Sequence, residues 1–155
     1  MASPVASSGR LIPSVRQLRI AVTFDLIDIN DRGDRNFDAL NEIEKDLYVL
    51  QLFDSLLIME GVRHFLTHHI EKLLRLLNFL ATIEAPNESA IRSIAGLLTS
   101  RASGPWDSDT FDECFPTDEG LDELNALQDA YYAETQEMWS CAREYVQQKY
   151  GAQIS

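Results

Sequence analysis

Glu60, His64 and His68 are spaced four residues apart, and His69 follows directly. Residues four apart share one face of a helix, where two imidazoles and a carboxylate together could bind zinc. The pattern differs from HExxH, because the glutamate precedes the first histidine and Gly61 interrupts the helix that would hold the ligands. We interpret these residues as polar side chains that hydrogen-bond within a half-buried turn, and we predict no metal and no cofactor. A metal protein or an uncharacterised enzyme remains the alternative.

The sequence lacks the common nucleophile and phosphate-binding motifs, namely GxSxG, the P-loop and GxGxxG. Its two cysteines, Cys114 and Cys141, have no CxxC spacing and no dedicated His and Asn beside them. We interpret them as reduced thiols of a cytoplasmic protein. We therefore predict no catalytic residues.

The segment from residue 102 to residue 142 is strongly acidic. It has no Lys or Arg, and its eleven carboxylates are Asp107, Asp109, Asp112, Glu113, Asp118, Glu119, Asp122, Glu123, Asp129, Glu134 and Glu137. Like charges one helical turn apart, such as Asp118 and Asp122, weaken a helix, whereas mixed signs would support it. Two interpretations stay open: a solvated surface that keeps the protein soluble, or a surface that a cationic partner protein binds.

Hydrophobic spacing predicts an all-α fold of five or six helices that position this segment. Residues 1–13 are expected to form a flexible tail and residues 14–155 a single domain. We expect helices over 14–29, 37–59, 70–83, 87–100 and about 117–150, a turn at 30–36 and a long loop at 101–117. A strand is the alternative near Val22 and Phe24, because apolar residues alternate there; we prefer helix, since no later segment looks like a pairing strand.

The last predicted helix has two faces that do not overlap. At 100° per residue, its apolar residues fall on one side and its carboxylates on the other. The apolar side contains Leu121, Leu124, Leu127, Tyr131, Met138, Ala142, Tyr145 and Val146. Gly151 is expected to end the helix. The carboxylates would then stand at fixed spacing on a rigid element.

Composition limits the partners that such a protein can have. The chain has 25 acidic and 13 basic residues and a net charge of −12. Binding phosphates requires Lys and Arg, so this balance argues against direct binding to nucleic acid or to an anionic membrane. No apolar run has the ~20 residues of a membrane span, and the start has no secretory signal pattern.

The segment YVLQLFDSLLIMEGVRHFLTH (48–68) resembles the part shared by bacterial DNA-mimic proteins of the DUF4375 type. That family has an aliphatic helix leading into Gly-Gly-Phe, a Gln, two aromatics and an Asn. Gly61 matches the second Gly and Phe65 an aromatic, while His64 and His68 stand at the Gln and Asn positions. Glu60, Val62 and Leu66 depart from the pattern. LLNFLATIEAPNESAIRSIAGLL and LDELNALQDAYYAETQEMWSCAREYV resemble later helices of the family, so the likeness covers about 100 residues.

The resemblance implies an all-helical, often dimeric protein that occupies the DNA site of a basic, DNA-binding protein. Duplex DNA presents one charge per ~1.7 Å of axis, whereas one i, i+4 row of carboxylates gives one per ~6 Å. Mimicry would therefore need several rows or a second subunit. An immunity-type protein that neutralises a basic toxin is the alternative, because it would share the acidic surface without resembling DNA.

Overall fold

The computed structural model describes residues 22–59, 61–101, 113–115 and 117–155, and these form an all-α protein, as predicted. Within these described residues there are seven α-helices: α3 (Leu26–Asn36), α4 (Glu42–Met59), α5 (Val62–His68), α6 (Leu73–Thr82), α7 (Glu88–Arg101), α9 (Asp118–Tyr132) and α10 (Thr135–Tyr150). The helices outnumber the predicted five or six because α5 is separate and the last helix is divided in two. Among the described helices, none has the length and apolar character needed to cross a membrane.

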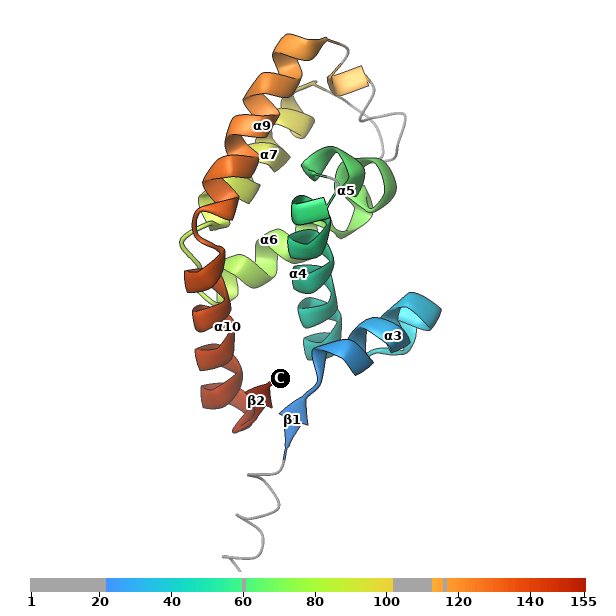
Figure 1. Cartoon of the computed structure of the whole chain (residues 1–155), viewed down its shortest axis with the longest axis vertical. Coiled ribbons are helices and arrows are strands. Elements are labelled where there is room, and N and C mark those ends of the chain that lie inside the picture. Colours follow the sequence, from blue (N-terminus) through green and yellow to red (C-terminus); the bar gives the residue numbers. More distant parts are fainter. Residues whose placement is uncertain (1–21, 60, 102–112, 116) are drawn as a thin grey trace, which may run out of the picture.

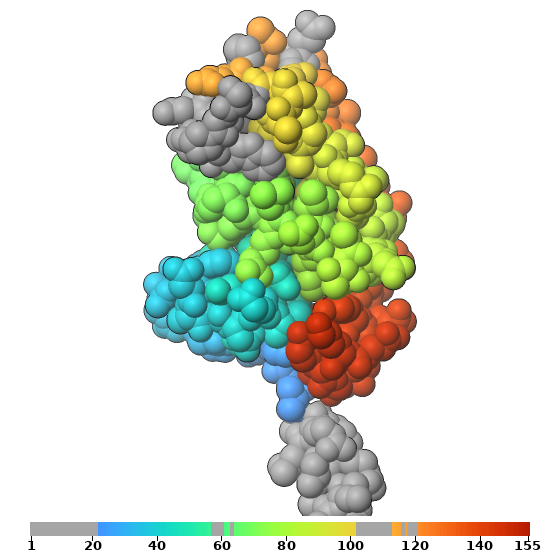
Figure 2. All heavy atoms as spheres, turned by 180° about the vertical axis from the view of Figure 1, so that it is seen from behind, coloured from blue at the N-terminus to red at the C-terminus, as the bar shows by residue number. Residues whose placement is uncertain are grey.

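The helices pack around α4, which runs through the middle of the molecule (Figure 1). Helices α9 and α10 follow one another along one long edge, and α3 projects on the other side of α4. Seen from behind, α5 and α6 fill the middle of the surface, with α7 above them and the α3–α4 side and α10 below (Figure 2). The acidic helices therefore form a margin of the molecule, outside the packed centre.

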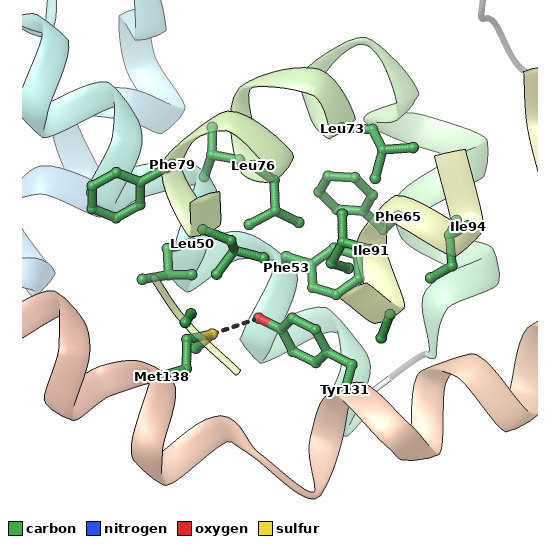
Figure 3. Close-up of a cluster of buried hydrophobic side chains, with 14 of the residues drawn as sticks. Leu50, Phe53, Phe65, Leu73, Leu76, Phe79, Ile91, Ile94, Tyr131 and Met138 are labelled. Atoms are coloured by element: carbon green, nitrogen blue, oxygen red, sulfur yellow. Dashed lines mark hydrogen bonds between the residues drawn. The ribbon is translucent and has the colours of Figure 1, made fainter. Parts of the chain in front are cut away.

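The core is one continuous cluster of buried hydrophobic side chains. At its centre, the ring of Phe53 meets Phe65 and Tyr131 edge-on, with centroids 4.7 and 4.8 Å away. Figure 3 shows these rings together with Leu50, Leu76 and Ile91 and the hydroxyl of Tyr131 directed at Met138. Residues of α4, α5, α6, α7, α9 and α10 thus share a single interior.

Helix α4 begins with a capping box. The Asn41 side chain accepts a hydrogen bond from the Glu44 N–H (3.0 Å), and the Glu44 carboxylate accepts one from the Asn41 N–H (3.1 Å). The helix predicted over 37–59 is consequently divided into the 3₁₀ turn η1 (Phe37–Ala39) and α4. An apolar stripe at helical spacing, through Leu40, Ile43 and Leu47, is buried.

Helices α6 and α7 agree with the predicted spans. The 3₁₀ turn η2 (Ile70–Lys72) precedes α6, and Leu73, Leu76 and Leu80 are buried. Leu74 is 54% exposed, because an amphipathic helix buries only one stripe of its surface. In α7 the apolar residues Ile91, Ile94, Ala95 and Leu98 all face the core.

The turn predicted at 30–36 is wrong, because these residues form the second half of α3. Asp25 caps this helix by accepting hydrogen bonds from the N–H groups of Ile27 and Asp28 at 3.0 and 3.3 Å. Arg32 pairs with Asp28 one turn away and with Glu44 of α4. These caps and pairs, with packing on α4, outweigh the turn-forming composition of the segment.

Helix was also the wrong choice at residues 23 and 24. Strand β1 (Thr23–Phe24) pairs in parallel with β2 (Gln153–Ile154), at the far end of the chain. The main-chain N–H of Ser155 donates to the Phe24 carbonyl (3.0 Å), and the Leu26 N–H donates to the Ser155 carbonyl (3.1 Å). A two-residue strand is too short to leave a sequence pattern, so its partner could not be recognised. The flexible tail and the start of the predicted first helix lie outside the described residues.

Candidate protein-binding face

Helices α9 and α10 are anchored by one apolar face. Leu124 and Tyr131 of α9 and Met138, Ala142 and Val146 of α10 are fully buried. Leu121, Leu127 and Tyr145 are partly buried against the same core. The apolar side predicted from helical spacing is thus confirmed, and it holds both helices against the rest of the molecule.

The opposite side of these helices carries the carboxylate face, which we define as Asp122, Glu123, Asp129, Glu134 and Glu137. All five are exposed. Asp118 and Glu119 lie in the first turn of α9, and Glu113 is exposed in the short segment before it. Asp107, Asp109 and Asp112 lie outside the described residues. The structure therefore brings together the helical members of the predicted acidic set.

The predicted single long helix is wrong at one point, because α9 ends at Tyr132 and α10 begins at Thr135. Glu134 has left the helical conformation (φ −112°, ψ 15°), and its N–H donates to the Tyr131 carbonyl at 3.1 Å. The Thr135 hydroxyl donates to the Tyr132 carbonyl at 3.0 Å. Tyr131 and Met138 both reach the core, as they would on a continuous helix, but the break divides the carboxylate face between two axes.

Only part of the carboxylate face is neutralised within the described residues. Arg101, at the end of α7, pairs with Glu123 at 3.0 Å and also donates to the Cys114 carbonyl at 3.2 Å. Its guanidinium lies 5.0 Å from the centre of the Phe115 ring. No described cation forms an ion pair with Asp122, Asp129, Glu134 or Glu137. The negative charges of these four side chains therefore remain available to attract a cationic binding partner.

The residues matched to the family motif position α5 against α9. Gly61 has a left-handed backbone (φ 84°), which favours glycine, and it precedes the first turn of α5. The next N–H, from Val62, donates to the Gln128 side chain of α9 at 2.7 Å. Phe65 is fully buried. Gly61, Val62 and Phe65 thus have structural roles, and Gln128, which the sequence did not single out, supplies the contact from α9.

The histidines of α5 lie side by side. The ring centroids of His64 and His68 are 4.4 Å apart, and those of His68 and His69 are 6.5 Å apart. Burial lowers the pKa of His69, and the nearby Lys72 charge lowers it further. Among the described residues, no group of three His, Cys, Asp or Glu side chains is arranged to hold a metal. Glu60, the third residue of the spacing considered above, lies outside them.

One recess includes a thiol. This recess has a volume of about 320 Å³ and is lined by Ile83, Glu84, Cys141 and Tyr145 among others. A second recess, of about 440 Å³, lies beside β2 and does not include the thiol. Burial raises the pKa of the Cys141 thiol, and the carboxylates of Glu137, Glu144 and Glu84 add to the rise. The thiol is therefore held in its protonated, weakly nucleophilic form at neutral pH.

A polar contact that sequence reasoning missed joins α4 to α10. Asp54, which lies one turn after Leu50 on the apolar side of α4, accepts a hydrogen bond from Nε1 of Trp139 at 3.2 Å. Burial raises the pKa of Asp54, and the Trp139 hydrogen bond opposes that rise. A carboxylate at a stripe position could have signalled such a contact, but its partner is 85 residues away in the chain.

Comparison of the chain with protein-family models, curated proteins and solved structures finds no match in any of the three.

Proposed function

We propose that this protein binds a basic partner protein through the carboxylate face of α9 and α10. The observation that carries the proposal is the set of four exposed carboxylates, Asp122, Asp129, Glu134 and Glu137, without a described cation beside them. Asp122, Asp129 and Glu137 stand on helices whose other face is buried, and Glu134 lies at the junction of the two helices, so the backbone holds the charges at fixed positions before binding. A partner then loses little affinity to ordering these groups.

The partner that fits this surface best is a DNA-binding protein, and the carboxylate face would occupy the site where that protein binds DNA. A cationic groove that binds phosphates also binds carboxylates at similar positions, because both are anions with exposed oxygens. The break at Glu134 gives the carboxylates two helix axes, so they are not confined to one straight row. Several rows are needed to approach the charge density of duplex DNA.

A matched pair of double variants tests the face. Asp122→Asn with Asp129→Asn removes two charges from it, and Asp31→Asn with Asp38→Asn removes two exposed charges from α3 and η1. The tagged wild-type chain is used to capture partners from its source cells, and each partner is purified and titrated. The face variant should bind at least several-fold more weakly, with a smaller salt dependence, while the α3 variant binds as the wild type does.

DNA competition tests the identity of the occupied site. The captured partner, saturated with this protein, should fail to bind its DNA. A partner that still binds DNA normally would contradict mimicry. If the binding of such a partner nevertheless required Asp122 and Asp129, that result would favour neutralisation of a basic toxin. Equal binding by both double variants would remove the carboxylate face from the function.

A further inference from the structure

Helix α4 contains two buried polar atoms that lack partners among the described residues, and one of them lies at the contact with the start of α10. Trp139 donates to Oδ2 of Asp54, but Oδ1 of Asp54 is buried without a hydrogen-bond partner among the described residues. Oε1 of Gln51 is buried and unpaired in the same way. Gln51 and Asp54 are three residues apart on α4, so they are neighbours on one face of the helix. Two buried acceptors side by side cost stability unless a donor joins them.

Apart from the Gln51 amide hydrogens, the described neighbours of Asp54 offer no donor to its Oδ1. From α9, the hydroxyl of Tyr131 donates to Sδ of Met138 at 3.0 Å, which occupies its proton. Tyr131 is the titratable neighbour, and the Asp54 charge adds to the burial that raises its pKa well above the usual range. From α10, Trp139 donates to the other oxygen. No described cation influences Asp54, whose raised pKa comes from burial.

We propose that Asp54 is a proton-dependent latch: with a proton on Oδ1 it donates to Gln51 Oε1, while Oδ2 still accepts from Trp139. One proton then satisfies both unpaired acceptors and removes a charge from the α4–α10 contact. When the proton leaves, the contact contains a buried carboxylate that faces an amide oxygen. The first turns of α10 are then held less firmly.

The latch lies next to the α10 end of the carboxylate face. Glu134 and Glu137 stand within five residues of Trp139, so the firmness of the α10 start determines how rigidly they are presented. The inference nevertheless stands apart from the proposed function, because it concerns the isolated chain and is tested without any partner.

The sign of the pH effect follows from the direction of the shift. The folded state favours protonated Asp54 more than the unfolded chain does, so folding takes up a proton. The contribution of Asp54 to stability is greatest below the ordinary Asp pKa of about 4 and is lost as pH rises through the higher folded pKa.

Indole N–H resonances provide the test on the full chain. The Trp139 Nε1–H signal, separated from that of Trp106 by a Trp106→Phe variant, is followed by NMR between pH 4 and pH 8. In the wild type it should titrate with a midpoint above the ordinary Asp range, and in Asp54→Asn it should not titrate. A wild-type Trp139 signal that stays constant over this range would overturn the latch.

The near-isosteric Gln51→Met variant tests the proposed acceptor. If protonated Asp54 donates to Gln51, removing the amide oxygen destabilises the protonated form and the Trp139 midpoint falls. If instead the Gln51 amide hydrogens donate to a charged Asp54, the midpoint rises, and the proposal is overturned. Because a methionine also makes the site less polar, which favours the protonated form, a fall would be decisive.

Discussion

At the scale of single residues, Gly33 shows how closely α3 lies on α4. A Cβ at this position would come within 2.3 Å of Cδ2 of Tyr48, whose hydroxyl donates to Asp34 at 2.6 Å. The Tyr48 ring is therefore held at one end by a hydrogen bond and has little freedom to move aside. We expect Gly33→Ala to destabilise the protein by about 1–3 kcal/mol, the usual cost of overpacking, in urea unfolding followed by circular dichroism.

Gly96 provides the matched control for that substitution. It also lies inside a helix, α7, but nothing stands within 4 Å of its missing Cβ. Gly96→Ala should stabilise the protein by about 0.5–1 kcal/mol, because alanine has the better helix propensity. Equal changes in the free energy of unfolding for the two variants would contradict the close approach of Tyr48 to Gly33.

His69 gives a residue-scale prediction about pH. Burial lowers its pKa, so the unfolded chain binds more protons at this site than the folded protein does. Its contribution to stability is complete above the ordinary His pKa of about 6.5 and is lost as pH falls toward the folded value. The free energy of unfolding, measured from pH 7 to pH 5, should therefore fall more in the wild type than in His69→Asn. Parallel curves would contradict this.

At the scale of elements, Gly151 joins α10 to β2. It follows the last residue of α10 in the left-handed conformation (φ 62°, ψ 29°), and its N–H donates to the Gln147 carbonyl at 3.0 Å. Gly151→Ala should lower the free energy of unfolding by about 1 kcal/mol, because a Cβ is unfavourable in that conformation. Gly151→Asn should cost less, since asparagine tolerates it better. Thermal unfolding measures whether Gly151→Asn is more stable than Gly151→Ala. Equal melting temperatures of the two variants would contradict this prediction.

Arg101 connects α7 to α9 and to the segment before it. It contacts the Glu123 carboxylate, the Cys114 carbonyl and the Phe115 ring. Arg101→Ala should destabilise the protein by about 1 kcal/mol, because it removes a planar group that serves three partners. Arg101→Lys should recover only a part, since an ammonium cannot reach two acceptors in a fixed fork. Full recovery in urea unfolding would show that charge alone matters.

At the scale of the whole molecule, an excess of negative charge opposes the compact state. The net charge is −12, and the carboxylate face has few cations near it. Asp122→Asn with Asp129→Asn should raise the melting temperature at low salt by roughly 1–2 °C, and by less at high salt, where screening already weakens the repulsion. A calorimetric scan at two salt concentrations checks this. A gain that did not depend on salt would point to a cause other than charge.

The all-α class and the positions of α4, α6 and α7 were predictable, because each has an apolar stripe with the helical period. The buried face of α9 and α10 was predictable for the same reason, and it placed the carboxylates on the outside. Errors arose where local composition and tertiary contact disagree. Residues 30–36 look like a turn but pack on α4 as a helix, since Gly33 permits the close approach of Tyr48.

The sequence by itself determined the helical class, the charge and the apolar face on which α9 and α10 pack. Only the tertiary structure decided the break at Glu134, the pairing of β1 with β2 and the contact of Asp54 with Trp139. The physical reason is that stripes and charges are local properties of the chain. Strand pairing and buried polar contacts join residues far apart in it, and no periodicity within one segment records its distant partner.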